Sequence, residues 1–247
     1  MNRPVEIAPG VFRLGTGWVN WYLVEEGGRY TAVDSAIRGY ASSLDDDLET
    51  IGAQRSDIAA LVLTHADDDH TGMAGTLSEG GAEVLVHREA EDLLRHPRPK
   101  GGDAKPINVL PQLWRPTLIR LLVHFAQNGA ARPGSFEGAT SYEAGEPLDV
   151  PGRPRPIATP GHAAGHCALL FEGKRVLFAG DALCTFNVFT GSRGPQLMPR
   201  QLNEDNGRAL ASLTALEDLP ADWVLPGHGD PFEGSPDAAV AEARSRA

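Results

Sequence analysis

The chain has 247 residues, 41% of them hydrophobic and 22% charged, which is typical of a soluble globular protein with a substantial core. Its formal net charge of −11 at pH 7 lacks the basic footprint of a general nucleic-acid binder. No stretch approaches the roughly 18 apolar residues of a membrane helix, the N-terminus does not resemble a signal peptide, and two cysteines argue against a disulfide framework.

The first segment is predicted to form a strand meander. Three short apolar runs are separated by turn residues: 10–14, 20–24 and 30–34. Between the second and third runs, Glu26-Gly27-Gly28-Arg29 is typical of a hairpin turn. Beyond them apolar residues recur at helical spacing, which predicts a helix over residues 40–54.

The next segment is predicted to alternate strands with helices. The expected strands are 58–64 and 82–87, and the expected helices are 71–79 and 89–95. Residues 97–140 differ, because they are rich in proline and contain an apolar helical stretch over 113–125. We interpret 97–140 as a helical insertion over the core fold, which could be a lid, a dimer contact or plain packing.

The last third of the chain again indicates strands followed by helices. The expected strands are 156–159, 167–171, 175–179 and 223–225, and the expected helices are 204–216 and 236–247. This order fits one domain over residues 1–247, in which two sheets pack together with helices outside.

The motif His65-Ala66-Asp67-Asp68-Asp69-His70 directly follows the apolar strand 58–64. It offers four metal ligands within six residues: His65, Asp67, Asp69 and His70. Successive side chains diverge, so one ion cannot take all four, whereas two adjacent ions can divide them. Three further candidates each follow a strand through a glycine that permits a sharp turn: His162, Asp181 and His228. The pattern predicts a two-metal centre at the strand ends.

This order of motifs resembles the metallo-β-lactamase-fold hydrolase superfamily, whose signature is His-x-His-x-Asp-His followed by a later His, Asp and His. The resemblance spans roughly residues 5–232. It implies an αββα four-layer sandwich of two mixed β-sheets flanked by helices, with the site along one edge. It also implies a ligand set: His65, Asp67 and His162 for the first ion, Asp69, His70 and His228 for the second, and Asp181 as a bridge.

The sequence departs from the signature at Asp67, which stands where the family has its second histidine. A carboxylate can bind zinc, but it is a harder ligand than imidazole and moves the preference toward iron or manganese. We therefore expect two divalent ions, with Zn²⁺ as the first choice and iron or manganese as alternatives. Flavodiiron proteins of the same superfamily also carry an acidic residue at this position.

The resemblance implies a metal-dependent hydrolase of a small molecule. A metal-activated hydroxide would attack an ester, lactone, thioester or phosphoester bond, with Asp69 as the catalytic residue that orients it or passes a proton to the leaving group. Two alternatives remain open: a di-iron redox protein or oxygenase, and a non-catalytic metal-binding protein. We expect a cytoplasmic location, no nucleic-acid or membrane partner, and a homodimer formed through the 97–140 insertion.

Residues around the motif receive supporting or structural interpretations. His166 is expected to pack or to support a ligand, and Asp34 either supports the site or caps a turn. Cys184 and His87 are expected to be structural. Several apolar residues either line a substrate pocket or pack in the core: Trp18, Trp21, Phe186, Phe189 and Met198.

Overall fold

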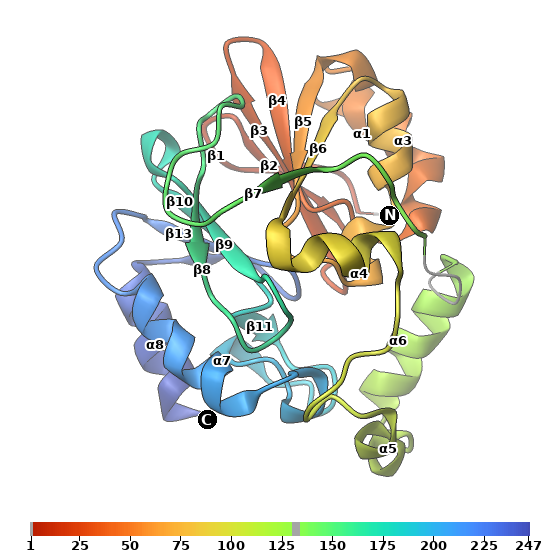
Figure 1. Ribbon diagram of the computed structural model, residues 1–247, viewed down its shortest axis with the longest axis vertical. Coiled ribbons are helices and arrows are strands. Elements are labelled where there is room, and N and C mark those ends of the chain that lie inside the picture. The colour runs from red at the N-terminus through yellow and green to blue at the C-terminus, as the bar shows by residue number, and fades with distance from the viewer. Residues whose placement is uncertain (1, 130–133) are drawn as a thin grey trace.

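The computed structural model describes residues 2–129 and 134–247, so that residue 1 and part of the predicted insertion, 130–133, lie outside the described residues. The described residues form four layers, with two β-sheets stacked between helices (Figure 1). The first sheet has the order β1 (Val5–Ala8), β2 (Val11–Gly15), β3 (Asn20–Glu26), β4 (Arg29–Val33), β5 (Ile58–Val62), β6 (Glu83–His87) and β7 (Thr140–Tyr142). Its strands are antiparallel from β1 to β4 and parallel from β4 to β7.

The second sheet has the order β14 (Phe232–Glu233), β13 (Trp223–Pro226), β10 (Val176–Gly180), β9 (Cys167–Phe171) and β8 (Arg155–Ala158). Within it β10 and β13 are parallel and the other pairs are antiparallel, so both sheets are mixed. A separate ribbon pairs β11 (Cys184–Phe186) with β12 (Arg193–Gln196).

Helices cover the outer face of each sheet (Figure 1). The first sheet is covered by α1 (Leu44–Thr50), α3 (Ala74–Glu79) and α4 (Glu91–Arg95), and the second by α7 (Asn206–Ser212) and α8 (Pro236–Ser245). Side chains alternate between faces along each strand. In β5, Leu61 packs toward the helices while Val62 packs between the sheets; in β9, Leu170 and Leu169 divide in the same way. The predicted αββα sandwich is confirmed.

The insertion contains α5 (Pro106–Val109) and α6 (Pro116–Gln127), which lie to one side of the layers (lower right in Figure 1). Leu118 and Leu121 of α6 pack on Val188 and Phe189, so its inner face is fixed to the core. The insertion also leaves large apolar residues exposed: Ile107, Leu110, Leu113, Trp114, Ile119, Leu122 and Val123. The homodimer through this surface stays a prediction.

The predicted helices are right in place but too long. Where a helix was predicted over 40–54, the structure has a 3₁₀ turn followed by α1. The helix predicted over 204–216 begins at residue 206, because the Asp205 side chain accepts a hydrogen bond from Arg208 N and caps α7 there. The predicted helix 113–125 begins at Pro116, which lacks an N–H and therefore suits the first helical turn. Within the described residues, no helix is long and apolar enough to cross a membrane.

Candidate metal centre

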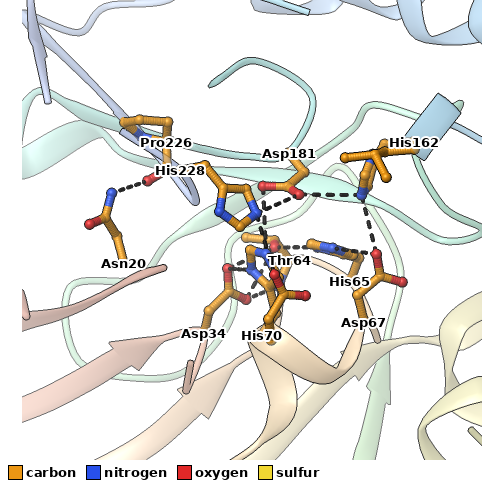
Figure 2. Close-up of polar contacts among 12 residues, drawn as sticks. Asn20, Asp34, Thr64, His65, Asp67, His70, His162, Asp181, Pro226 and His228 are labelled. Atoms are coloured by element: carbon orange, nitrogen blue, oxygen red, sulfur yellow. Dashed lines mark hydrogen bonds and ion pairs between the residues drawn. The ribbon is translucent and has the colours of Figure 1, made fainter. Parts of the chain in front are cut away.

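The seven predicted ligand residues meet at one edge of the sandwich, where strands of both sheets end. Figure 2 labels all of them except Asp69. The segment after β5 carries four of them, beginning at His65, and α2 (Asp68–Thr71) starts within it. The second sheet contributes three: Asp181 directly after β10, and His162 and His228 in the loops after β8 and β13. Strands of the rigid core therefore position both halves of the site.

Potential ligand atoms fall into three groups, in each of which they lie within 4.8 Å of one another: His65 with Asp67 and His162; His65 with His70 and Asp181; Asp69 with His70 and His228. The four histidines and Asp181 are buried. Asp67 and Asp69 retain about a fifth of their side-chain exposure, 20% and 19%. These two carboxylates are therefore the ligands that an entering molecule can reach.

The Nδ1 atoms of His65 and His70 are held by a buried network around Asp34 (Figure 2). Thr64 Oγ1 donates its single proton to Asp34 Oδ2 at 2.9 Å, so it accepts from His65 Nδ1 at 2.9 Å. His70 Nδ1 donates directly to Asp34 Oδ2 at 2.8 Å. Both imidazoles therefore present Nε2 to the site.

The other two histidines are oriented in the same sense from the opposite side. His162 Nδ1 donates to Asn203 Oδ1 at 3.0 Å. The Asn203 amide nitrogen donates to Met198 O at 3.1 Å, which fixes which end of the amide faces the histidine. His228 Nδ1 donates to the backbone carbonyl of Trp18.

With every Nδ1 proton directed outward, four Nε2 lone pairs converge on carboxylate oxygens. His228 Nε2 lies 3.1 Å and His70 Nε2 3.5 Å from Asp181 oxygens, and His65 Nε2 lies 3.4 Å from Asp67 Oδ2. Among the described residues, buried His65 Nε2, His70 Nε2 and Asp181 Oδ1 have no hydrogen-bond partner. Acceptors that face acceptors require cations between them, and imidazole with carboxylate is a donor set suited to divalent transition metals.

The electrostatics of the site also call for positive charge. Burial by itself would lower the pKa of His228, but the nearby Asp181 carboxylate outweighs it and raises this pKa to about 9. The same competition raises the pKa of His70 well above its usual value. Burial would raise the pKa of Asp181, yet His228 and His70 hold it well below its usual range. A bound cation would take the place of protons that these carboxylates otherwise attract.

Sequence reasoning missed the residues that hold the loop of His228. Asn20 Nδ2 donates to Pro226 O at 3.1 Å and to Gly229 O at 2.7 Å, and Tyr22 Oη donates to Pro226 O at 2.7 Å. The first sheet thus holds a loop of the second (Figure 2). These contacts span more than 200 residues of sequence; the one local signal is that buried Asn20 begins an apolar strand.

Lys100 is a further residue that the sequence did not indicate. Its ammonium pairs with Asp67 and lies 2.7 Å from His162 Nε2. Burial would raise the pKa of Asp67, but Lys100 and His65 hold it well below its usual range. A cationic side chain from the insertion therefore reaches the candidate ligands.

His166 lies beside the ligands but has both ring nitrogens occupied. Its Nδ1 lies 2.7 Å from Thr159 Oγ1, and its Nε2 accepts from the Asp181 backbone N–H at 3.0 Å. The structure thus places His166 as a support for Asp181. Asp34 supports His70 as described, and Cys184 is buried.

A cavity of about 330 Å³ opens onto the candidate ligands. Its apolar wall is made by the insertion and by the segment after β11: Val109, Leu118, Leu121, Leu122, Phe125, Val188, Phe189, Met198 and Leu202. Of the aromatic and methionine residues expected around a pocket, Phe189 and Met198 line it. Trp21 is buried in the core instead, and Trp18 packs edge-on against Phe186 at 5.3 Å between ring centroids.

Comparisons with known proteins agree with this fold. The sequence model of the metallo-beta-lactamase superfamily matches residues 14–228. The Bacillus subtilis protein "Probable metallo-hydrolase YflN" is 25% identical over 242 residues, covering 93% of this chain and 87% of that protein. The metallo-beta-lactamase family protein TTHA1429 from Thermus thermophilus is 27% identical, with a TM-score of 0.67 and coverage of 98% and 81%. A Cronobacter sakazakii metallo-β-lactamase, 20% identical, shares the fold over 99% and 92% of the two chains with a TM-score of 0.70.

Proposed function

Because the chain belongs to the metallo-β-lactamase superfamily, we propose that it is a metal-dependent hydrolase with a two-ion centre that cleaves an ester, lactone or thioester bond of an apolar small molecule. Zinc is the first choice of metal, and iron or manganese are alternatives because of Asp67. The observation that carries the proposal is the convergence of four Nε2 lone pairs on three carboxylates at the mouth of a cavity.

The ligand set divides between two ions. The first would be held by His65, Asp67 and His162, the second by Asp69, His70 and His228, and Asp181 would serve both. Bound divalent ions would activate water at neutral pH and polarise the bond under attack. The chain itself contributes orientation, since each histidine is fixed through Nδ1 by Thr64, Asp34, Asn203 or the Trp18 carbonyl.

Asp69 is the proposed catalytic residue. Its Oδ2 lies 3.5 Å from His228 Nε2, and its side chain lines the cavity. A partly exposed carboxylate in that position can hold the proton of the attacking water and deliver it to the leaving group.

The lining of the cavity favours an apolar substrate group. Ten apolar side chains, Ala104 included, line the cavity beside the candidate ligands, while Lys100 is the cationic residue other than histidine among the described lining residues. An acyl or alkyl chain would bury apolar surface there, whereas a phosphoester would bring a second charge into an apolar wall. We therefore rank carboxylic esters, lactones and thioesters above phosphoesters.

Metal analysis of the purified protein, paired with esters, lactones, thioesters and a phosphodiester of graded acyl length, tests the proposal. We expect bound divalent metal, and a gain in kcat/KM of about fourfold for each added methylene until the cavity is filled. Two bound irons with oxygen uptake would support the di-iron alternative. Bound metal without turnover of any substrate would support a non-catalytic protein.

With both proteins saturated with metal, Asp69→Asn should reduce kcat by about 10²–10⁴-fold while leaving the melting temperature nearly unchanged. Asp68→Asn is the matched control, because Asp68 is the adjacent carboxylate and belongs to none of the three ligand groups. Equal losses of activity and stability in Asp69→Asn would argue against the catalytic role.

A further inference from the structure

Lys100 is brought to the site by the chain between α4 and α5. Pro97 and Pro99 restrict the backbone on both sides of Arg98, which lowers the entropy cost of presenting the next side chain. The Arg98 side chain is 58% exposed, whereas that of Lys100 is only 13% exposed. The segment therefore directs one cation outward and the other into the site.

The surroundings of the Lys100 ammonium satisfy it completely. A lysine ammonium has three N–H donors and no acceptor. Three acceptors lie around it: the Asp67 carboxylate, His162 Nε2 at 2.7 Å and Leu202 O at 3.3 Å. His162 can accept here because its Nδ1 proton is committed to Asn203.

Two of these three acceptors are also candidate metal ligands. His162 and Asp67 face each other across 3.2 Å, a contact between a lone pair and a carboxylate that is favourable only with a cation beside it. A lone pair of His162 Nε2 can hold a proton of the ammonium or a metal ion, but not both. Lys100 and a metal ion therefore compete for one set of atoms.

We propose that Lys100 is the resident cation of the first subsite, formed by His65, Asp67 and His162, and that a metal ion enters this subsite only by displacing the ammonium. The inference rests on the proposed metal centre and adds the order in which metal ions bind its two subsites. The second subsite, around Asp69, His70 and His228, has no lysine contact within the described part of the chain and binds its ion first.

This inference also accounts for the aspartate at position 67. A carboxylate pairs with an ammonium, whereas the imidazole usual at this position carries no compensating charge. One divalent ion and one ammonium balance the three carboxylates Asp67, Asp69 and Asp181. The site is thus formally neutral with a single metal ion and Lys100 in place.

Metal stoichiometry and affinity, measured by elemental analysis and by competition with a chromophoric zinc chelator, test the proposal without reference to activity. The wild-type protein should bind one zinc ion tightly and a second weakly. Lys100→Met, which keeps the stem and removes the charge, should strengthen the weaker site by roughly ten- to hundredfold. Lys100→Arg should keep it weak, and Arg98→Met is the matched control from the same segment.

A double-mutant cycle with Asp67→His identifies the partner of the ammonium. If Asp67 holds Lys100 in the subsite, the gain from Lys100→Met should shrink in the Asp67→His background. Two equally tight zinc ions in the wild type, unchanged in Lys100→Met, would overturn the inference and leave the proposed hydrolase intact. Failure of every variant to bind metal, with circular dichroism showing folded protein, would overturn the metal centre itself.

Discussion

The positions of the histidine Nδ1 protons determine what the site can bind. Each of the four histidines gives its Nδ1 proton to an oxygen outside the centre, so the lone pair of each Nε2 is left for a cation. Asp34 is central to this arrangement, since its two oxygens accept from Thr64 N at 2.8 Å, Thr64 Oγ1 and His70 Nδ1. The metal preference of the site is therefore built partly by residues that would not touch the metal.

Asp34→Asn separates the charge of this residue from its shape. Asp34 has a φ of 57°, a left-handed conformation that asparagine also tolerates, so the backbone need not change. The amide nitrogen would face a donor, which should cost about 1–3 kcal/mol of unfolding free energy. Zinc affinity should fall about 10–100-fold because His70 is no longer fixed. Chemical denaturation and chelator competition measure the two effects.

Asp218→Asn is the matched control for that change. Asp218 is exposed and has nearly the same backbone conformation, with a φ of 58°. A similar loss of metal affinity in both variants would show that asparagine at a left-handed position, rather than the contact with His70, is responsible.

At the same scale, the sequence indicated the seven candidate ligands and raised a supporting role for Asp34 and His166, but it indicated neither Asn203, which orients a ligand, nor Lys100. The candidate ligands follow apolar stretches of sequence that predict strands. An apolar stretch that ends in glycine is a local signal for a strand followed by a sharp turn. Lys100 and Asn203 carry no such signal, because they meet His162 across 62 and 41 residues of sequence. Contacts of that range depend on the path of the insertion, which no periodic pattern specifies.

Among the elements, the loop after β13 is tightly constrained. Gly227 N donates to Gly180 O at 2.9 Å, and Asn20 N donates to Gly227 O at 2.8 Å, so both sheets fix its backbone. A Cβ at Gly227 would overlap Asp181 Oδ1 and come within 2.5 Å of His70 Cε1. Glycine is required here by close approach, since it lets the loop pass against two candidate ligands.

Gly227→Ala should therefore displace Asp181 or His70 and weaken zinc binding by at least about tenfold, with a destabilisation of roughly 1–3 kcal/mol from overpacking. Gly75→Ala in α3 is the control, because its added Cβ meets open space and should be neutral or slightly stabilising. Isothermal titration with zinc and thermal unfolding of both variants provide the comparison. Normal zinc affinity in Gly227→Ala would mean that the loop can yield without moving the ligands.

Strands with a run of apolar residues were predicted from the sequence. Strands that form only because a neighbouring strand pairs with them were not. The long runs became β3, β5, β9 and β10, as expected from their composition. The short strands β1, β7, β11, β12 and β14 were not predicted, because each gains its strand geometry from a partner and not from its own residues. Most helices begin later than predicted for a different reason, because caps and prolines override periodicity.

In the molecule as a whole, the site joins two sheets that also meet through apolar packing and through the hydrogen bonds of Asn20 and Tyr22 to the loop after β13. Val62 and Phe178 belong to the same core cluster from opposite sheets, and that cluster lies behind the candidate ligands. The first sheet supplies the segment from His65 to His70, and the second supplies His162, Asp181 and His228. Without a metal ion or bound protons, this junction brings together lone pairs and carboxylates that repel one another.

Removal of metal by a chelator should therefore destabilise the whole fold rather than one loop. Free zinc at a hundredfold excess over its dissociation constant stabilises a native state by about 2.7 kcal/mol. For a domain of this size, that corresponds to a fall in melting temperature of about 5–10 °C on chelation, reversed by added zinc. Differential scanning calorimetry measures the shift.

Hydrogen exchange distinguishes a metal ion that connects the two sheets from one that orders a single loop. If bound metal connects the two sheets, amide protection should rise together at the ends of β5, β10 and β13, because each of these strands leads into a ligand loop. A variant with both His65→Ala and His228→Ala should show neither the thermal shift nor the change in protection. A rise confined to the segment after β5 would mean that the metal orders one loop, and that apolar packing and the hydrogen bonds of Asn20 and Tyr22 hold the sheets together without it.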